Sequence, residues 1–247
     1  MIVDPVFYAV AVPAVILMGI SKSGFGAGFG ALAVPLMALV VPVPQAAAIL
    51  LPVLLLIDGL GLMALIKHCD RALLRLLIPA GLLGVVIGAL LFGLLSGKTV
   101  AGVVGAMTLI FLAIRLRWPP RADAPPPPRW LGWLLGTASG FTSFVAHAGS
   151  PPIGFYVLPL KLSPLVFAAT IGVFFAVVNL AKWLPYALLG LIDQSNLATS
   201  LMLLPAAPLG VWLGLRIVKH VSPALFYRLF HIGLLLTGSK LLWDGLH

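Results

Sequence analysis

The chain has 247 residues, of which 62% are hydrophobic and only 9% are charged. Soluble domains carry roughly 25% charged residues, so this composition excludes a water-soluble globular protein and indicates that lipid is the solvent. The net charge of +9 does not indicate nucleic-acid binding, because the basic residues lie at the ends of apolar runs and form no basic stripe. The single cysteine, Cys69, excludes a disulfide framework and a cysteine-based metal site.

Apolar segments follow one another along nearly the whole chain. A helix needs about 20 apolar residues to cross a hydrocarbon core of roughly 30 Å, and the segments at 5–21, 25–41 and 150–160 are shorter. They are either half-helices or tilted re-entrant pairs, which a membrane tolerates where the backbone between them is buried or lines a cavity. We predict an all-α integral membrane protein with about 8–10 transmembrane or half-helical segments in two inverted repeats. The ten segments are 5–21, 25–41, 45–66, 72–95, 98–117, 130–147, 150–160, 163–188, 195–216 and 222–243.

The lysines and arginines between these segments are distributed unequally. If successive segments alternate sides, only Lys98, Lys182 and Lys240 of the 15 basic residues fall on one side, and all the others fall on the opposite side. The basic side of a membrane protein is cytoplasmic, so both termini are predicted to be on the opposite, periplasmic side. The Pro-rich linker at 118–129 then lies in the cytoplasm, where its four consecutive prolines favour an extended spacer.

The linker divides the chain into two halves, 1–117 and 130–247, that resemble each other. Each half opens with a helix, a Gly/Ser-rich break and a short helix containing proline, and the two breaks are Gly19–Leu36 and Gly140–Leu160. Each half has an odd number of crossings, so the halves are predicted to be oppositely oriented, as in many secondary transporters. The alternative is that Gly, Leu and Ala recur in any membrane protein. Further glycines match in order: Gly84 and Gly88 with Gly210 and Gly214.

The first break combines glycines with two hydroxyls and one ammonium. Glycine lets backbone N–H groups approach a ligand, and a helix that starts after such a loop presents unpaired N–H groups and a positive dipole end. This pattern predicts an anion site. Alternatively, the glycines serve close helix packing and Lys22 is a plain cytoplasmic loop lysine. The candidate substrate-binding residues here are Ser21, Lys22, Ser23, Gly24, Gly26 and Gly28.

The second break is followed by two prolines, Pro151 and Pro152. Proline at a helix start presets the backbone, so a half-helix here would aim its N-terminus at the break. His147 within the break could bind an anion, shuttle protons or be a satisfied structural histidine. The candidate substrate-binding residues here are Thr142, Ser143, His147, Gly149 and Ser150.

Three polar residues interrupt the long apolar segments at matching levels: Asp58 in one half, and Asn179 and Lys182 in the other. An ionisable side chain inside a membrane is costly and is a functional candidate by default. Asp58 could carry a coupling proton, or it could form a static pair with Lys182 that holds the bundle together. Lys182 could instead snorkel outward, because Trp183 and Tyr186 beside it are typical of a membrane interface.

These features together resemble the sulfite exporter TauE/SafE family of bacterial and archaeal anion transporters. The resemblance covers nearly the whole chain and is most specific at Gly19-x4-Gly24-Phe25-Gly26-x-Gly28 and Val34-Pro35. The family usually carries a denser glycine run at this place, and the second break departs further from it. The resemblance implies a multi-pass protein of the bacterial inner (plasma) membrane that transports sulfite, sulfoacetate and related sulfur-containing or carboxylated anions.

We therefore expect a secondary transporter that exports small sulfur-containing or organic anions by alternating access, with or without proton coupling. The alternative is a passive anion channel of the same fold. An enzyme is not expected, because the chain has no catalytic motif or paired carboxylates, and neither a cofactor nor a metal is expected. The expected partners are a small anionic substrate and the lipid bilayer, with no nucleic acid, and a homodimer is one arrangement that the sequence allows.

The predicted topology can be tested with a reporter that fluoresces only in the cytoplasm. Fused after His247, it should give no signal, because the distribution of basic residues places the C-terminus in the periplasm. Inserted in the linker at 118–129, the same reporter should be bright. A bright fusion at the C-terminus would contradict both the orientation and the inverted repeat.

Overall fold

The computed structural model describes residues 1–25, 33–92, 94, 96–117, 126–220 and 223–246, and within these ranges the chain is helical with no β-strand. Gly26 and Gly28 of the first break, and most of the linker, lie outside the described residues. The helices are α1 (Pro5–Ile20), α2 (Ala33–Met37), α3 (Val43–Leu65), α4 (Arg71–Leu91), α5 (Gly97–Arg117), α6 (Arg129–Ala146), α7 (Ser150–Val157), α8 (Pro164–Ala181), α9 (Trp183–Leu188), α10 (Gln194–Leu203), α11 (Ala206–His220) and α12 (Pro223–Leu246), with short turns η1 (Ser21–Phe25), η3 (Ile66–His68) and η4 (Leu158–Leu160).

Aspartate begins three of these helices. The carboxylates of Asp4, Asp70 and Asp193 accept hydrogen bonds from backbone N–H groups in the first turns of α1, α4 and α10, at 2.9, 2.9 and 2.7 Å. Asp is among the preferred residues for this N-cap position, because its side chain satisfies an N–H that has no partner within the helix. Three of the chain's six acidic residues therefore lie at helix N-termini, where hydrogen bonds from the backbone offset the desolvation cost of a carboxylate.

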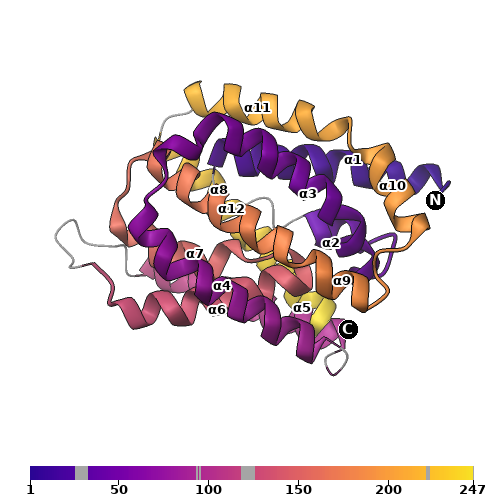
Figure 1. The fold of residues 1–247 in the computed structure, drawn as a ribbon, viewed down its shortest axis with the longest axis horizontal. Helices are drawn as coiled ribbons and strands as arrows, with labels where there is room; N and C mark the ends of the chain where they lie inside the picture. The colour runs from indigo at the N-terminus through magenta and orange to yellow at the C-terminus, as the bar shows by residue number, and fades with distance from the viewer. Residues whose placement is uncertain (26–32, 93, 95, 118–125, 221–222, 247) are drawn as a thin grey trace.

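The helices are arranged around a central pair (Figure 1). Helices α1 and α11 pack together along one side of the molecule, and α4 and α6 pack together along the opposite side. Between them α3 contacts α8, while α5 and α12 form a further pair. Each of these four pairs joins a helix from one half of the sequence to a helix from the other half. The two halves are thus interlocked and do not form separate domains.

The long helices have the length and composition of membrane spans. Four candidate spans, at Pro5–Ser23, Val43–Met63, Arg71–Leu91 and Leu165–Leu188, pass this test among the described residues. The predicted segment at 195–216 is instead divided into α10 and α11, which are bent by 44° and have the length and composition of a span only as a pair. The bend falls at Pro205. Proline has no backbone N–H to donate to the helix, and its ring clashes with the backbone of the preceding turn.

Several close glycine contacts join the halves, and two of them involve glycines that the sequence matches between the halves. A Cβ placed on Gly19 of α1 would lie 2.9 Å from the backbone of Gly210 in α11, and a Cβ on Gly84 of α4 would lie 2.9 Å from Cα of Gly140 in α6. These four residues are the ones that the sequence pairs as repeats, Gly19 with Gly140 and Gly84 with Gly210. In one contact the glycine that starts a break belongs to the first half, and in the other contact it belongs to the second half. Small residues at such crossings let helix backbones approach closely in a membrane.

We expect Gly140→Ala to destabilise the bundle. Its Cβ would lie 1.9 Å from the carbonyl oxygen of Gly81, so α4 and α6 must separate, at a cost of about 1–3 kcal/mol. Gly59→Ala is the matched control, because a Cβ there meets nothing within 4 Å, and alanine favours a helix over glycine by about 1 kcal/mol. Thermal unfolding in detergent should show a lower midpoint for Gly140→Ala only, and equal midpoints would show that the crossing is loose.

Candidate functional site

The centre of the bundle carries a polar contact between the two halves. Asp58 lies on α3 and Asn179 on α8, and both side chains are buried. The Asn179 amide Nδ2 donates a 2.6 Å hydrogen bond to Asp58 Oδ2. The two residues are 121 positions apart, as are Gly19 and Gly140 of the matched breaks. Residues separated by the offset that relates the starts of the two breaks therefore touch each other at the middle of the molecule.

Lys22 of the first break reaches this contact. It lies in η1, a π-helical turn that continues α1, and its ammonium forms an ion pair with Asp58 Oδ1. The Asp58 side chain is 4% exposed and the Lys22 side chain 18% exposed. Lys22 is thus not a surface loop lysine, and the direct partner of Asp58 is Lys22 and not Lys182. Single π-turns within α-helices are often found at functional sites.

Lys182 is completely buried, with 0% exposure, and does not snorkel outward. Four acceptors surround its Nζ: the Ser143 carbonyl at 2.7 Å, the Ser143 hydroxyl at 2.8 Å, Asn179 Oδ1 at 2.8 Å and His147 Nδ1 at 2.9 Å. An ammonium has three N–H groups and no lone pair, so every proton of Lys182 has an acceptor within the protein. Lys182 therefore joins the second break to the central contact.

His147 ends α6 in the left-handed conformation, with φ of 50°. Its backbone N–H and that of Ala148 turn back to the carbonyls of Ser143 and Thr142, which closes the helix end. Its ring lies between Lys182 and the carbonyl oxygen of Ala47, which is 2.8 Å from Nε2. Since Nδ1 faces a donor and Nε2 an acceptor, the ring carries its proton on Nε2.

The two halves place their ammonium groups differently. Counting 121 positions onward, Lys22 of the first break corresponds to Ser143, and Gly61 of α3 corresponds to Lys182. The first half has its lysine in the break, whereas in the second half Lys182 directly follows the last residue of α8. A Cβ on Gly61 would meet nothing within 4 Å, so open space lies beside α3 at this residue.

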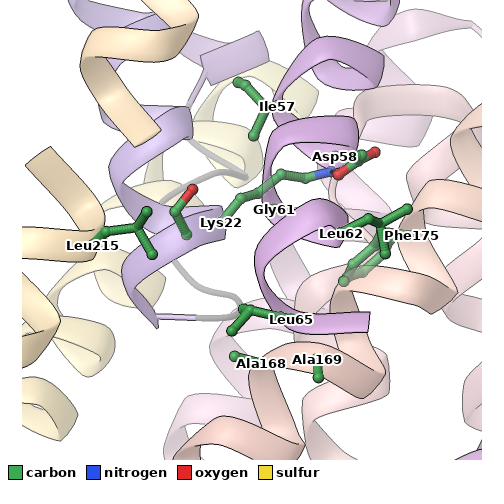
Figure 2. A pocket seen from close by; sticks show the side chains of 12 residues that line it. Lys22, Ile57, Asp58, Gly61, Leu62, Leu65, Ala168, Ala169, Phe175 and Leu215 are labelled. Carbon is green, nitrogen blue, oxygen red and sulfur yellow. Dashed lines mark hydrogen bonds and ion pairs between the residues drawn. The ribbon is translucent and has the colours of Figure 1, made fainter. Parts of the chain in front are cut away.

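That open space is part of a cavity beside Lys22 (Figure 2). Its volume is about 30 Å³, enough for about two water molecules. Apolar side chains form most of the wall, and the polar groups are Lys22, Ser23 and Asp58. The Lys22 ammonium also lies 5.6 Å from the ring centre of Phe175, in cation–π range. The lining residues come from η1, α3, α8 and α11: Lys22, Ser23, Ile57, Asp58, Gly61, Leu62, Leu65, Ala168, Ala169, Gly172, Phe175 and Leu215.

Ser23 is the unusual member of this wall. Its residue exposure is 6%, and its hydroxyl has no hydrogen-bond partner within the described part of the chain. Buried polar groups are nearly always hydrogen-bonded, so an unpartnered one calls for an explanation. A hydroxyl and an ammonium that share a cavity wall are suited to bind an oxyanion that enters it.

The other predicted residues are distributed as follows. Thr142 donates to the carbonyl of Ala138 at 2.9 Å, so its hydroxyl is used within α6. Gly149 packs tightly, because a Cβ there would lie 2.7 Å from Phe175 and from the Ser139 carbonyl. Ser21 is buried, Gly24 lies in η1, and Ser150 begins α7.

None of the second-break residues lines the cavity, so that break reaches it through Lys182 and Asn179. No group of histidine, cysteine and carboxylate residues that could hold a metal occurs among the described residues.

Comparison with known proteins agrees with this picture. The family model of the sulfite exporter TauE/SafE matches residues 11–241. Curated proteins and solved structures give no significant match. The matched range contains both breaks, both central helices and every residue that lines the cavity.

We expect the Lys22–Asp58 pair to be strongly coupled in stability. Lys22→Met or Asp58→Asn alone leaves one charge buried without its partner, at a cost of roughly 3 kcal/mol, while the double variant should lose much less than the sum. The half-exposed pair Lys240–Asp244 on α12 is the control, and Lys240→Met or Asp244→Asn should each cost below about 1 kcal/mol. Additive losses for Lys22 and Asp58 in denaturation curves would contradict the pairing.

Proposed function

Because this chain belongs to the sulfite exporter TauE/SafE family, it is a multi-pass membrane transporter of the sulfite and anion exporter type, and we propose that it exports sulfite or a sulfonate such as sulfoacetate. The observation that carries the choice of ligand is the cavity wall at η1. There the Lys22 ammonium and the unpartnered Ser23 hydroxyl face one space in the middle of the bundle. The proposed location is the bacterial inner membrane, with both termini in the periplasm.

The chemistry of the wall favours a small oxyanion. Sulfite and sulfonates present several oxygens on one sulfur, and each oxygen accepts hydrogen bonds. Lys22 supplies a charge-assisted donor, and Ser23 supplies a second donor from the next position of the same turn. The remaining wall is apolar, which excludes water and strengthens the attraction between the ammonium and an anion. Since the cavity holds only about two waters, it must widen when an oxyanion with four or more heavy atoms enters.

Alternating access is proposed to arise from the interlocked halves. In inverted-repeat transporters the substrate site lies near the midplane at the repeat interface, and one repeat rocks against the other. Here the cavity lies beside the contact of α3 with α8, where equivalent residues of the two halves meet. The paired glycine crossings of α1 with α11 and of α4 with α6 provide two similar surfaces on which such a movement can occur.

Ser23→Ala gives the cleanest test of this site. The Ser23 hydroxyl bonds to no described protein group, so its removal should leave the melting temperature unchanged or raise it slightly. Anion affinity should nevertheless fall by about threefold to tenfold, because a neutral hydrogen bond contributes about 0.5–1.5 kcal/mol. Isothermal titration of purified protein with sulfite and sulfoacetate measures the affinity, and efflux from proteoliposomes measures transport.

Lys22→Gln should have a larger effect, about tenfold to 150-fold on affinity, because it removes a charge-assisted bond of about 1.5–3 kcal/mol. Lys240→Gln is the control for a lost positive charge elsewhere and should bind as the wild type does. If wild-type protein binds and moves no oxyanion, while a cation or neutral solute binds well, the proposed function is wrong. Unchanged affinity in both Ser23→Ala and Lys22→Gln would place the anion site elsewhere.

A further inference from the structure

We propose that Asp58 and the transported anion compete for Lys22, and that a proton on Asp58 releases Lys22 to the anion. The inference rests on the proposed function and deepens it, because it names the proton as the second ligand of the same site. In this structure the Lys22 ammonium is bound by a carboxylate of the protein itself. Asp58 thus holds the cation that the substrate requires, and the cavity where the substrate would enter adjoins both side chains (Figure 2).

The orientation of the Asn179 amide determines which oxygen of Asp58 can carry a proton. Lys182 Nζ lies 2.8 Å from Asn179 Oδ1, and an ammonium can only donate hydrogen bonds. The Asn179 oxygen must therefore face Lys182, which leaves the amide nitrogen facing Asp58 Oδ2 at 2.6 Å. Turning the amide over would break both of these buried hydrogen bonds, and Lys182 is itself held in place by Ser143 and His147.

The position of a proton on Asp58 follows from this orientation. Oδ2 already accepts a hydrogen bond from the Asn179 N–H, and a proton placed there would face a donor. A proton on Asp58 therefore belongs on Oδ1. Oδ1 is the atom that accepts from the Lys22 ammonium, and a proton on Oδ1 would point toward that ammonium. Protonation also removes the negative charge of Asp58, so the ion pair with Lys22 is lost and only a weak contact between neutral and charged groups can remain.

Charge balance gives the stoichiometry. With Asp58 ionised, Lys22 is neutralised within the protein, and an entering anion would bring an uncompensated negative charge into an apolar cavity. When Asp58 takes up one proton, Lys22 is free to bind the anion, and the new O–H of Asp58 becomes a donor toward the same anion. One proton therefore accompanies each anion, and the pair is released together. A monovalent anion is then moved without net charge, and a dianion such as ionised sulfoacetate is moved with one net negative charge.

Ionisable groups on the helices that pack against α3 do not replace Asp58 in this role. Lys182 lies at the end of α8 and His147 at the end of α6, and the two side chains are buried and bonded to each other. Tyr8 of α1 donates to the carbonyl of Ile2. The Arg216 guanidinium of α11 lies over the Trp212 ring at 4.2 Å on an exposed part of the helix. In the described part of these elements, Asp58 is the carboxylate that lies at the cavity.

Proton movement in wild-type proteoliposomes is the first test. Sulfoacetate is the probe, because its sulfonate and carboxylate both stay ionised between pH 6 and 8, so it carries no proton of its own. A pH-sensitive dye inside the vesicles should report about one proton moved per anion. The dissociation constant of sulfoacetate, measured by titration, should increase as the pH rises from 6 to 8. The increase should approach about tenfold per pH unit, which is the limit that linkage sets for one coupled proton.

Asp58→Asn should mimic the protonated side chain, with its amide oxygen toward Asn179 and its NH₂ toward Lys22. It should bind sulfoacetate at pH 8 at least as tightly as the wild type does at pH 6, with no pH dependence, and its anion flux should move no protons. Asp244→Asn removes the carboxylate of the other Lys–Asp pair and should keep the wild-type proton movement. If Asp58→Asn does not fold, the proton count and pH dependence of the wild type decide alone.

The possible outcomes separate this inference from the proposed function. Anion flux with no accompanying proton, together with pH-independent binding in the wild type, would overturn the competition and leave the anion transporter intact. Protons that move opposite to the anion would also overturn the competition. The proposal requires the proton and the anion to be bound at the same time, so both must cross the membrane in the same direction. No binding and no flux of any oxyanion would overturn both proposals.

Discussion

Buried charge is the constraint on which the centre of this molecule depends. Lys22, Asp58 and Lys182 lie among apolar helices, where an ion without partners costs several kcal/mol even after the surroundings relax. The structure meets this cost with one continuous set of contacts that runs from Lys22 through Asp58, Asn179 and Lys182 to His147. Because each member orients the next, the network connects α1, α3, α6 and α8 and constrains how these helices sit relative to one another.

Close backbone packing makes this network possible. The glycine crossings of α1 with α11 and of α4 with α6 hold the outer helices tightly against the centre. Without a hydrophobic driving force between helices in lipid, such crossings depend on van der Waals contact over small residues. They also join opposite halves of the chain, so that neither half encloses the charged residues alone.

Most of the helices can be predicted from the local sequence, whereas the arrangement of the charged residues at the centre can be predicted only in part. The apolar runs and proline positions predict most helices, and the offset between the halves predicts that Asp58 and Asn179 share a level. The inward direction of Lys182 is different. Trp183 and Tyr186 suggest an interface, yet the Tyr186 hydroxyl is buried and donates to the Phe144 carbonyl at 2.5 Å. Helix α8 is apolar on every face, so its sequence does not mark which face is inside. Phe175 and Gly61 of the cavity wall likewise carry no signal that separates them from packing residues.

The unequal placement of the two ammonium groups has a consequence for direction. If the halves were chemically equal, exchanging their conformations would give two end states of equal energy, and the carrier would work alike both ways. Under the rocking movement proposed above, the Lys22 ammonium would move with its break, whereas Lys182 lies at the end of the central helix α8, 121 positions after Gly61. The two end states would then differ in electrostatic energy and in affinity for the anion. Such a carrier would bind the anion more readily from one side of the membrane, and a single lysine-for-glycine difference between the two halves would be the source of that preference.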